Sequence, residues 1–438
     1  MIFSVSNLKK TWYYLQKNGV KAAWSAAIER IEQSRKKPYI YETVPEQELE
    51  RQRKHAVSDL CISLVVPAYE TKPEHLTALL DSLAAQTYQN WELVIADASQ
   101  SSCVKEALDA WQKARAVNGS RTGSIRYLKL SENKGISENT NAGIEAAAGD
   151  YIGLLDHDDL LTPDALYEMV SAIEEGRAVG MRTGVLYSDE DKCDGSGSLF
   201  YEPHRKMDFN LDLLLSNNYI CHFLVMESGL MKALKLRTEY DGAQDFDLVL
   251  RAASAGERFW HVPKVLYHWR CHNDSTAANP RSKAYAYEAG KRAVEDFCRS
   301  KGWKASVSHL KHLGFYRADY EGNLFESRKD IGAVAGPLPA GKNLNSGIYE
   351  KDGHMRYEGL RRGFSGPMHR AALTQDVNCA DLRTLKVREE FRPLYEQALK
   401  RVKESKNESD LIRESQVLCE QIRNAGYLIL WDPQRQER

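Results

Sequence analysis

Long apolar runs, paired cysteines and glycine-rich phosphate loops are all missing from this 438-residue sequence. No stretch approaches the ~20 consecutive apolar residues that a bilayer-spanning helix needs, and no signal-peptide pattern opens the chain. The eight cysteines stand singly without a CxxC pair, which argues against a zinc site or a disulfide framework. Unpaired cysteines suit a reducing compartment, so we expect a cytoplasmic protein.

Net charge is also small. The formal value is −1, which gives no global reason to expect nucleic acid as a partner. Apolar residues make up 42% and charged residues 28%, as in soluble globular proteins. A chain of this length exceeds what one hydrophobic core usually serves, so two or more folded units are expected.

Two nucleotide-binding motifs are absent where they would be expected. No GxGxxG follows the first strand-like run, which disfavours a dinucleotide-dependent oxidoreductase. Residues 69–73 also lack the glycine-rich loop with Lys or Arg that a nucleotidyltransferase would use to hold a triphosphate.

The first segment, residues 1–57, reads as a helical arm with a break at Gly19. Residues 1–37 contain eight Lys or Arg and two Glu, with Trp12 and Trp24 among them. Basic and aromatic residues on one helix fit peripheral contact with an anionic membrane surface. The alternative is a helical arm packed on the catalytic domain, because most amphipathic helices face a core.

The second segment, residues 58–315, alternates strand and helix patterns. Strand-like runs lie at 61–66 (closed by Pro67), 92–96, 125–130 and 151–155, and residues 137–148 read as a helix. This alternation predicts an α/β fold with a mainly parallel sheet covered by helices on both faces. Ligands of such sheets bind at the carboxyl ends of the strands.

An acidic turn follows the last of these runs. Asp156, Asp158 and Asp159 flank His157, and three carboxylates in four residues would repel one another without a cation or solvent. Mg²⁺ and Mn²⁺ prefer such oxygens and complete their shell with phosphate oxygens. The alternative is an acidic turn that caps the helix after Thr162.

Other polar residues stand at neighbouring strand ends. Tyr69 could cover a nucleobase, and Asp97 could accept from a base N–H or a ribose hydroxyl. Asn133, Lys134 and Gly135 lie in the loop before a helix. Each feature alone is more often a turn or a cap than a ligand.

Farther along, Asp245 stands near the start of a helix-like run and could be either a helix cap or a general base that deprotonates an acceptor hydroxyl. His268 could be a further metal ligand, although a lone histidine is more often structural, and Arg270 could bind phosphate.

Taken in order over some 210 residues, these motifs resemble the inverting GT-A glycosyltransferases of family 2. The resemblance implies a GT-A fold, a nucleoside-diphosphate sugar donor (dTDP- or UDP-linked) and Mg²⁺ or Mn²⁺. It implies Asp245 as the base and Asp156, Asp158 and His268 as metal ligands. The implied donor-binding residues are Pro67, Ala68, Tyr69, Glu70, Asp97, Asn133, Lys134, Gly135, Asp156, His157 and Arg270. The implied acceptor-binding residues are Asp189, Glu190, Asp191, Gln244 and Trp269.

Two positions depart from the family pattern. Thr140 stands where many members have Arg, and Gln244 replaces the usual Glu before the base. Residues 186–191 and 268–270 resemble a bacterial, rhamnosyltransferase-like subgroup that builds surface polysaccharides. We expect transfer to a saccharide hydroxyl, on a lipid-linked acceptor, with no nucleic acid involved. The alternative is a non-catalytic scaffold that binds nucleotide sugars, which Thr140 and Gln244 would fit.

The third segment, residues 316–438, resembles the acceptor half of a second such domain through 331–334, 363–366 and 426–431. No acidic strand end precedes these runs, so we expect this segment to be non-catalytic. A long polar helical stretch is predicted over roughly 386–423.

Overall fold

The computed structural model describes residues 5–34, 37–55, 57–117, 123–271, 284–339 and 341–435. The chain forms two compact units. The sheet unit comprises residues 37–209 and 219–293, and the terminal unit comprises residues 1–36, 210–218 and 294–438. These boundaries differ from the three consecutive segments expected from the sequence, a division that remains a prediction.

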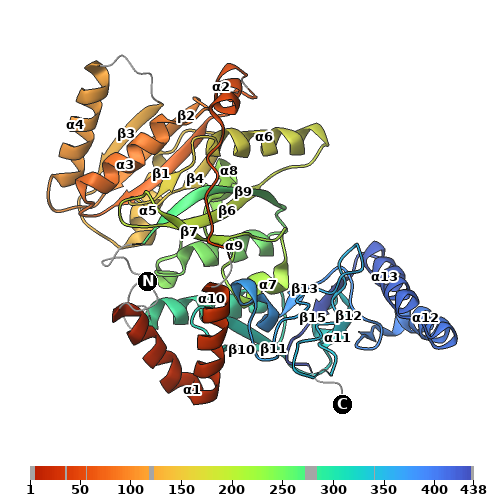
Figure 1. Cartoon of the computed structure of the whole chain (residues 1–438). Coiled ribbons are helices and arrows are strands. Elements are labelled where there is room, and N and C mark those ends of the chain that lie inside the picture. Colours follow the sequence, from red (N-terminus) through yellow and green to blue (C-terminus); the bar gives the residue numbers. More distant parts are fainter. Residues whose placement is uncertain are drawn as a thin grey trace. The chain divides into compact units, whose positions relative to one another are not determined.

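A nine-stranded mixed sheet forms the centre of the sheet unit, in the order β3-β2-β1-β4-β8-β6-β9-β5, with β7 paired to β6 (Figure 1). Strands β3, β2, β1 and β4 run parallel, and the antiparallel strand β8 joins them to the rest. The strands are β1 (Ile62–Ala68), β2 (Trp91–Asp97), β3 (Ser124–Lys129), β4 (Tyr151–Leu154), β5 (Leu160–Leu161), β6 (Val185–Cys193), β7 (Phe200–His204), β8 (Leu224–Glu227) and β9 (Phe259–Arg270). The helices are α2 (Glu46–Lys54), α3 (Pro73–Ala84), α4 (Cys103–Val117), α5 (Ile136–Ala146), α6 (Ala165–Ala178), α8 (Ser228–Leu234) and α9 (Gln244–Ser254).

Helices cover both faces of the parallel strands. Every residue of β1 and β2 is buried, which explains their continuous apolar sequence. Leu64 and Ile95 pack in one core with Leu79 of α3. On the opposite face α5 lies close to β1, because a Cβ on Gly143 would come within 2.6 Å of Val65 Cγ1. The predicted α/β sheet with helices on both faces is therefore confirmed.

The predicted strands agree with the structure to within one or two residues. One expectation was wrong: Pro67 does not close the first strand but pairs with Ala96 inside β1. Proline lacks only the N–H, and here it stands one residue before the strand ends, where few ladder bonds remain to be lost.

The terminal unit contains a four-stranded sheet in the order β13-β15-β12-β14 and a separate β10–β11 hairpin. Its strands are β10 (Ala305–His309), β11 (Tyr316–Tyr320), β12 (Ile331–Ala335), β13 (Gln375–Asp376), β14 (Lys386–Val387) and β15 (Leu428–Trp431). Its helices are α1 (Val5–Ser34), α7 (Leu211–Ser216), α11 (Leu324–Ser327), α12 (Arg392–Ser405) and α13 (Glu408–Asn424), while α10 (Ala284–Ser300) contributes to both units. Trp431 and Ile422 are fully buried in its core.

Two helix breaks are instructive. The break expected at Gly19 is present, since Gly19 has φ +79° inside α1. The polar helical stretch expected over roughly 386–423 is present, and it is divided into the two helices α12 and α13. Lys406 adopts a left-handed conformation after α12, and the side chain of Asn407 caps α13 by accepting from Ser409 N at 3.1 Å.

In the described part of the chain, no helix has the length and apolar character that crossing a membrane requires.

Candidate active site

The carboxyl ends of β1, β2 and β4 lie next to one another, because β1 pairs in parallel with both of the other strands. Ala68 at the end of β1 is in register with Asp97 at the end of β2. Asp156 follows β4 after one intervening residue. The sheet therefore brings the predicted residues of three strand ends to one edge.

Asp97 is fully buried and held by three donors. Its carboxylate accepts from Ser99 N at 2.8 Å, from the Tyr127 hydroxyl at 2.6 Å and from Lys129 Nζ at 3.1 Å. Burial alone would raise the pKa of Asp97, but these hydrogen bonds outweigh it and hold the pKa below its ordinary value. Asp97 is thus an ionised, rigidly placed acceptor.

Tyr69 and Glu70 form the turn directly after β1. The Tyr69 ring is 45% exposed. The carboxylate of Glu70 accepts from the Ser101 hydroxyl at 2.5 Å, from Ser101 N at 3.0 Å and from Gln100 N at 2.7 Å. The bonds from Ser101 lower the pKa of Glu70 to about 2. Glu70 therefore ties this turn to the loop after β2 and leaves the Tyr69 ring accessible.

The loop that leads into α5 contains Asn133, Lys134 and Gly135. Asn133 Oδ1 accepts from Gly135 N at 3.1 Å, and Lys134 pairs with Glu132 at 3.0 Å on the surface. Gly135 has φ +94°, and a Cβ there would lie 2.6 Å from Asp241 Oδ2. Only glycine fits this close approach, so the backbone shape of the loop is fixed.

Asp159 is the most deeply buried carboxylate of the acidic turn. Its Oδ2 accepts from the Tyr267 hydroxyl at 2.5 Å and its Oδ1 from Arg270 N at 2.7 Å. Burial raises the pKa of Asp159, and the charges of Asp156 and Asp158 raise it further. These contacts join the turn to β9.

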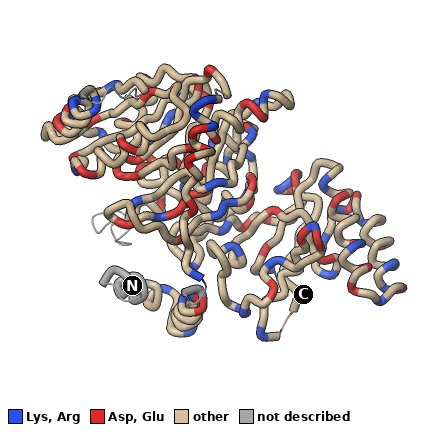
Figure 2. Tube along the Cα trace, turned by 45° about the horizontal axis from the view of Figure 1, so that its top comes forward, with Lys and Arg blue, Asp and Glu red and all other residues tan. Residues whose placement is uncertain are grey.

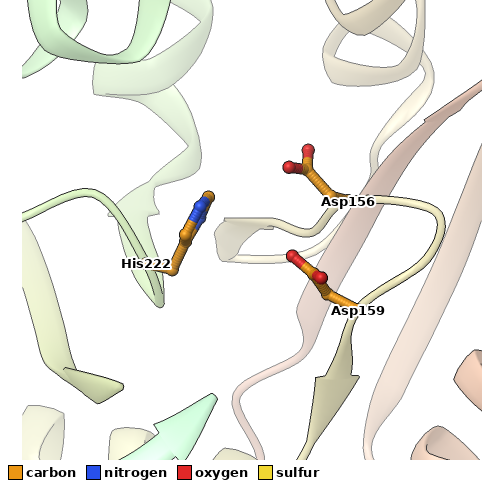
Figure 3. A group of neighbouring side chains, drawn as sticks. All are labelled: Asp156, Asp159 and His222. Atoms are coloured by element: carbon orange, nitrogen blue, oxygen red, sulfur yellow. The ribbon is translucent and has the colours of Figure 1, made fainter. Parts of the chain in front are cut away.

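Asp156, Asp159 and His222 form a group that can hold a metal ion (Figure 3). One potential ligand atom from each lies within 4.8 Å of the others. His222 comes from the chain before β8, and its ring stacks on Tyr267 at 4.6 Å between centroids. Among the described residues its imidazole nitrogens have no hydrogen-bond partner. Two carboxylates and one imidazole are donors that fit Mn²⁺ or Mg²⁺ and leave coordination positions open.

This group differs from the predicted ligand set, since Asp159 and His222 stand in place of Asp158 and His268. His268 is buried, its Nδ1 lies 2.5 Å from Asp191 Oδ1, and its ring packs on Phe200. That geometry favours a structural role, and His268 as a metal ligand remains a prediction. Asp158 lies close enough to raise the pKa of Asp156, and its role as a ligand remains a prediction.

Asp245 stands in the first turn of α9, as expected, and is half-buried. The Cys221 thiol donates to Asp245 Oδ2 at 3.7 Å. Although Asp156 is partly exposed, the protein around its carboxylate raises its pKa, and the charges of Asp158 and Asp245 add to this effect. The predicted base and the acidic turn therefore share one electrostatic environment. Gln244 Oε1 accepts from the backbone N–H of residue 242 at 2.7 Å, so it shapes the turn before α9.

The three acidic residues predicted to bind the acceptor, Asp189, Glu190 and Asp191, are buried in β6. Each is engaged within the protein. Asp189 accepts from His261 Nε2 at 2.9 Å and Lys206 N at 2.8 Å, Glu190 pairs with Lys206 Nζ at 3.3 Å, and Asp191 contacts His268 and the Tyr39 hydroxyl at 2.9 Å. This arrangement favours a positioning role, and acceptor binding by these residues remains a prediction.

Lys206 holds the segment that carries His222. Its side chain is fully buried, and its Nζ donates to Ile220 O at 2.5 Å and to His222 O. Glu190 Oε2 in turn accepts from His222 N at 3.3 Å. The buried pair thus fixes backbone groups on both sides of Cys221.

Arg270, predicted to bind phosphate, is buried against the acidic turn. Its Nε donates to Asp158 O at 2.5 Å and its Nη1 to Gly195 O at 2.9 Å. Among the described residues Nη2 is buried without a partner, as is Nδ1 of His157. Trp269 is half-buried beneath the ammonium of Lys192. Arg270 therefore holds the backbone of the acidic turn, and its Nη2 has no hydrogen-bond partner among the described residues.

Sequence reasoning missed His222 and Lys206. Neither residue stands in a motif. His222 lies in residues 219–223, where the only pattern is an apolar run interrupted by one histidine. An isolated histidine or lysine becomes informative only when folding brings distant carboxylates to it.

Part of the chain matches a known protein family. Residues 63–233 match the model of glycosyl transferase family 2, and this span includes the acidic turn and His222. This part of the chain is therefore similar to family 2 glycosyltransferases, the family that the sequence motifs resemble.

Similar proteins come from several bacteria. The protein y4gI of Sinorhizobium fredii is 38% identical over 263 residues, which are 59% of this chain and 28% of that protein. The O-antigen biosynthesis protein RfbC of Myxococcus xanthus is 33% identical, over 56% of this chain and 19% of that protein. The amylovoran biosynthesis glycosyltransferase AmsB of Erwinia amylovora is 28% identical, over 48% of this chain and 71% of that protein.

The chain thus spans less than a third of the first two relatives. Among solved structures, S. aureus TarS residues 1–349 with UDP-GlcNAc is a distant neighbour, with 19% identity, a TM-score of 0.42, and coverage of 55% of this chain and 66% of that one.

Proposed function

We propose that this protein is a metal-dependent, inverting glycosyltransferase that moves a sugar from a nucleoside-diphosphate donor to a saccharide hydroxyl. The observation that carries the proposal is the convergence of Asp156, Asp159 and His222 beside the carboxyl ends of the parallel strands. This group lies inside the span that matches family 2, and Asp245 stands in its electrostatic environment.

The donor would lie along the strand ends. The exposed ring of Tyr69 is available to stack on the base, and the ionised Asp97 is available to accept from a base N–H or a ribose hydroxyl. The rigid loop at Gly135 presents its backbone at the same edge. A dTDP- or UDP-linked sugar is proposed.

The acidic turn would hold the diphosphate end through a divalent cation. Asp156, Asp159 and His222 would bind Mg²⁺ or Mn²⁺, with Asp158 as a further candidate ligand. When bound, the cation supplies positive charge that stabilises the departing diphosphate. Arg270 keeps the turn in place through the backbone carbonyl of Asp158.

Asp245 would act as the base. Its carboxylate takes the proton from the acceptor hydroxyl while the acceptor oxygen forms a bond to the anomeric carbon. The bond from that carbon to the diphosphate oxygen breaks in the same step, and the electron pair leaves with the nucleoside diphosphate. Attack from the face opposite the leaving group inverts the anomeric centre.

The acceptor and setting follow from what similar proteins are named for. RfbC is named for O-antigen biosynthesis and AmsB for amylovoran biosynthesis. We place this protein in cell-surface polysaccharide synthesis, with hexosyl or rhamnosyl transfer to a lipid-linked glycan. Residues 1–37 would bring it to the cytoplasmic face of a membrane.

The test is release of nucleoside diphosphate from a panel of sugar nucleotides in the presence of Mg²⁺, Mn²⁺ or EDTA. We expect metal-dependent release from one donor, lost in Asp156→Ala and retained in Asp109→Ala. Asp109 is the matched control, because its carboxylate is exposed and pairs with Lys105 on the surface of α4. Absence of release from every donor, together with absence of donor binding by calorimetry, would contradict the proposal.

A further inference from the structure

The N-terminal helix α1 has two faces of opposite character beyond the kink at Gly19. One face carries both of its acidic residues and is held within the terminal unit. Glu29 is buried, and its carboxylate accepts from Ser365 N at 3.0 Å and from Gly366 N at 2.8 Å. Glu32 pairs with Arg361 at 2.9 Å. These contacts hold the helix and fix its rotation, and Arg361 balances the charge of Glu32.

The opposite face carries apolar side chains in water. Val20 is 75% exposed, Trp24 69% and Ile31 45%, and Ala27 is also exposed. Positions 20, 24, 27 and 31 recur at three- and four-residue spacing, so they form one stripe along the helix. A Trp and two β-branched residues in a single exposed row exceed the scattered apolar residues normal for a protein surface.

Basic side chains border this stripe. Lys21 and Arg30 are exposed, and among the described residues neither has an acidic partner. Lys17 is also exposed and donates to Leu310 O at 3.1 Å. Figure 2 shows Lys and Arg in blue and Asp and Glu in red along the chain, including the described part of this helix. Glu29 is buried and Glu32 is paired with Arg361, and the exposed residues from Val20 to Ile31 are all apolar or positive.

We propose that the outward face of α1, from Val20 to Ile31, lies on an anionic lipid surface. Val20, Trp24 and Ile31 enter the boundary between headgroups and acyl chains, and Lys21 and Arg30 meet the lipid phosphates. Trp is favoured at that depth because its ring is apolar and its N–H remains hydrated. Positive side chains beside it suit a negatively charged leaflet.

The inner face of α1 is held by residues 361–366, which belong to the terminal unit as α1 does. One face of the helix is held through Glu29 and Glu32, while the other face is exposed to solvent. The inference extends the proposed function, because a lipid-linked acceptor would be met at such a surface. The test of lipid binding nevertheless does not depend on sugar transfer.

The experiment is co-sedimentation of the full chain with phosphatidylcholine vesicles that contain or lack phosphatidylglycerol, at low and high salt. We expect binding to the anionic vesicles only, weakened by salt. The triple variant Val20→Ser, Trp24→Ser, Ile31→Ser should lose binding more than tenfold. Lys21→Glu and Arg30→Glu should each weaken it at least about fivefold, the equivalent of one charge near a lipid surface.

Matched controls change the same chemistry elsewhere. Val179→Ser alters another exposed valine, and Lys400→Glu with Lys403→Glu alters two exposed lysines of α12. Both should bind vesicles as the unchanged protein does. Because the altered α1 side chains are exposed, the triple variant should keep its thermal midpoint and its nucleoside-diphosphate release without vesicles.

Two results would overturn the proposal. One is unchanged vesicle binding by the triple variant. The other is self-association in sedimentation velocity that the triple variant abolishes, without vesicle binding by the unchanged protein, since the stripe would then be an interface between two copies. Failure of nucleoside-diphosphate release would count against the proposed function and leave vesicle binding interpretable.

Discussion

The ammonium of Lys206 lies 3.3 Å from the carboxylate of Glu190, and both side chains are buried. Burial alone would raise the pKa of Glu190, but the charge of Lys206 outweighs it and lowers the pKa below its ordinary value. The pair also binds the backbone on both sides of Cys221 through Ile220 O and His222 N. Because this buried ion pair binds the backbone at Ile220 and His222, it also fixes where the side chains of this loop lie.

The first prediction concerns this pair and the metal site. Lys206→Met should weaken Mn²⁺ binding by about 10- to 100-fold, as loss of groups that orient metal ligands does. It should also destabilise the fold by about 3–5 kcal/mol, because Glu190 would remain buried and unpaired. Mn²⁺ binding is measured by electron paramagnetic resonance and stability by urea unfolding without metal.

A double variant separates positioning from folding. Lys206→Met with Glu190→Met removes both charges and should recover most of the lost stability, yet Mn²⁺ affinity should stay low because His222 is no longer held. The control is Lys192→Met, which breaks the surface pair between Lys192 of β6 and Glu202 of β7. Normal Mn²⁺ affinity in the double variant would show that the pair serves stability alone.

The second prediction distinguishes the two histidines. His222→Ala should lower Mn²⁺ affinity at least about tenfold with little change in stability, since its ring is half-buried and has no hydrogen-bond partner among the described residues. His268→Ala should instead destabilise the fold by about 1–3 kcal/mol, because it strips Asp191 of a buried partner. The same two assays apply. The reverse pattern would restore His268 as the ligand.

Part of the fold and part of the candidate site could be predicted from the sequence. Alternating strand and helix patterns located β1, β2 and β4, because buried parallel strands are apolar along their whole length. Asp97, Asp156 and Asp245 were found because they stand at the ends of such elements, where chain position alone places them at the ligand edge. Local pattern and tertiary position agree at these residues.

His222 and Asp159 could not be assigned in the same way. Both acquire their role from contacts between distant parts of the chain: His222 stacks on Tyr267, and the Tyr267 hydroxyl donates to Asp159. Within one acidic turn, the sequence cannot tell which carboxylate turns inward. The break at Lys406 was also missed. A left-handed residue at a helix end is usually a glycine, and here the position is occupied by a lysine.

The third prediction concerns pH and Asp97. Its pKa is lowered in the folded state, so its contribution to stability is complete above the unfolded value of about 3.9 and is lost as the pH falls toward the folded value. Asp97→Asn should therefore cost most at neutral pH, and the difference from the unchanged protein should shrink on acidification. Urea unfolding from pH 6 downward measures it. A constant difference would contradict the assignment.

The fourth prediction tests the base. Asp245→Asn keeps the size of the side chain but cannot take a proton, so transfer should fall by about 10²- to 10⁴-fold or more. Donor affinity and Mn²⁺ binding should change little, because Asp245 lies outside the group of Asp156, Asp159 and His222. Transfer is measured as saccharide product and affinity by calorimetry, with Glu239→Gln as an exposed control before the same helix. Substantial residual transfer would remove Asp245 from the reaction. A parallel loss of donor affinity would instead place its carboxylate at the donor, because a residue that acts only on the acceptor proton leaves the ground-state donor complex intact.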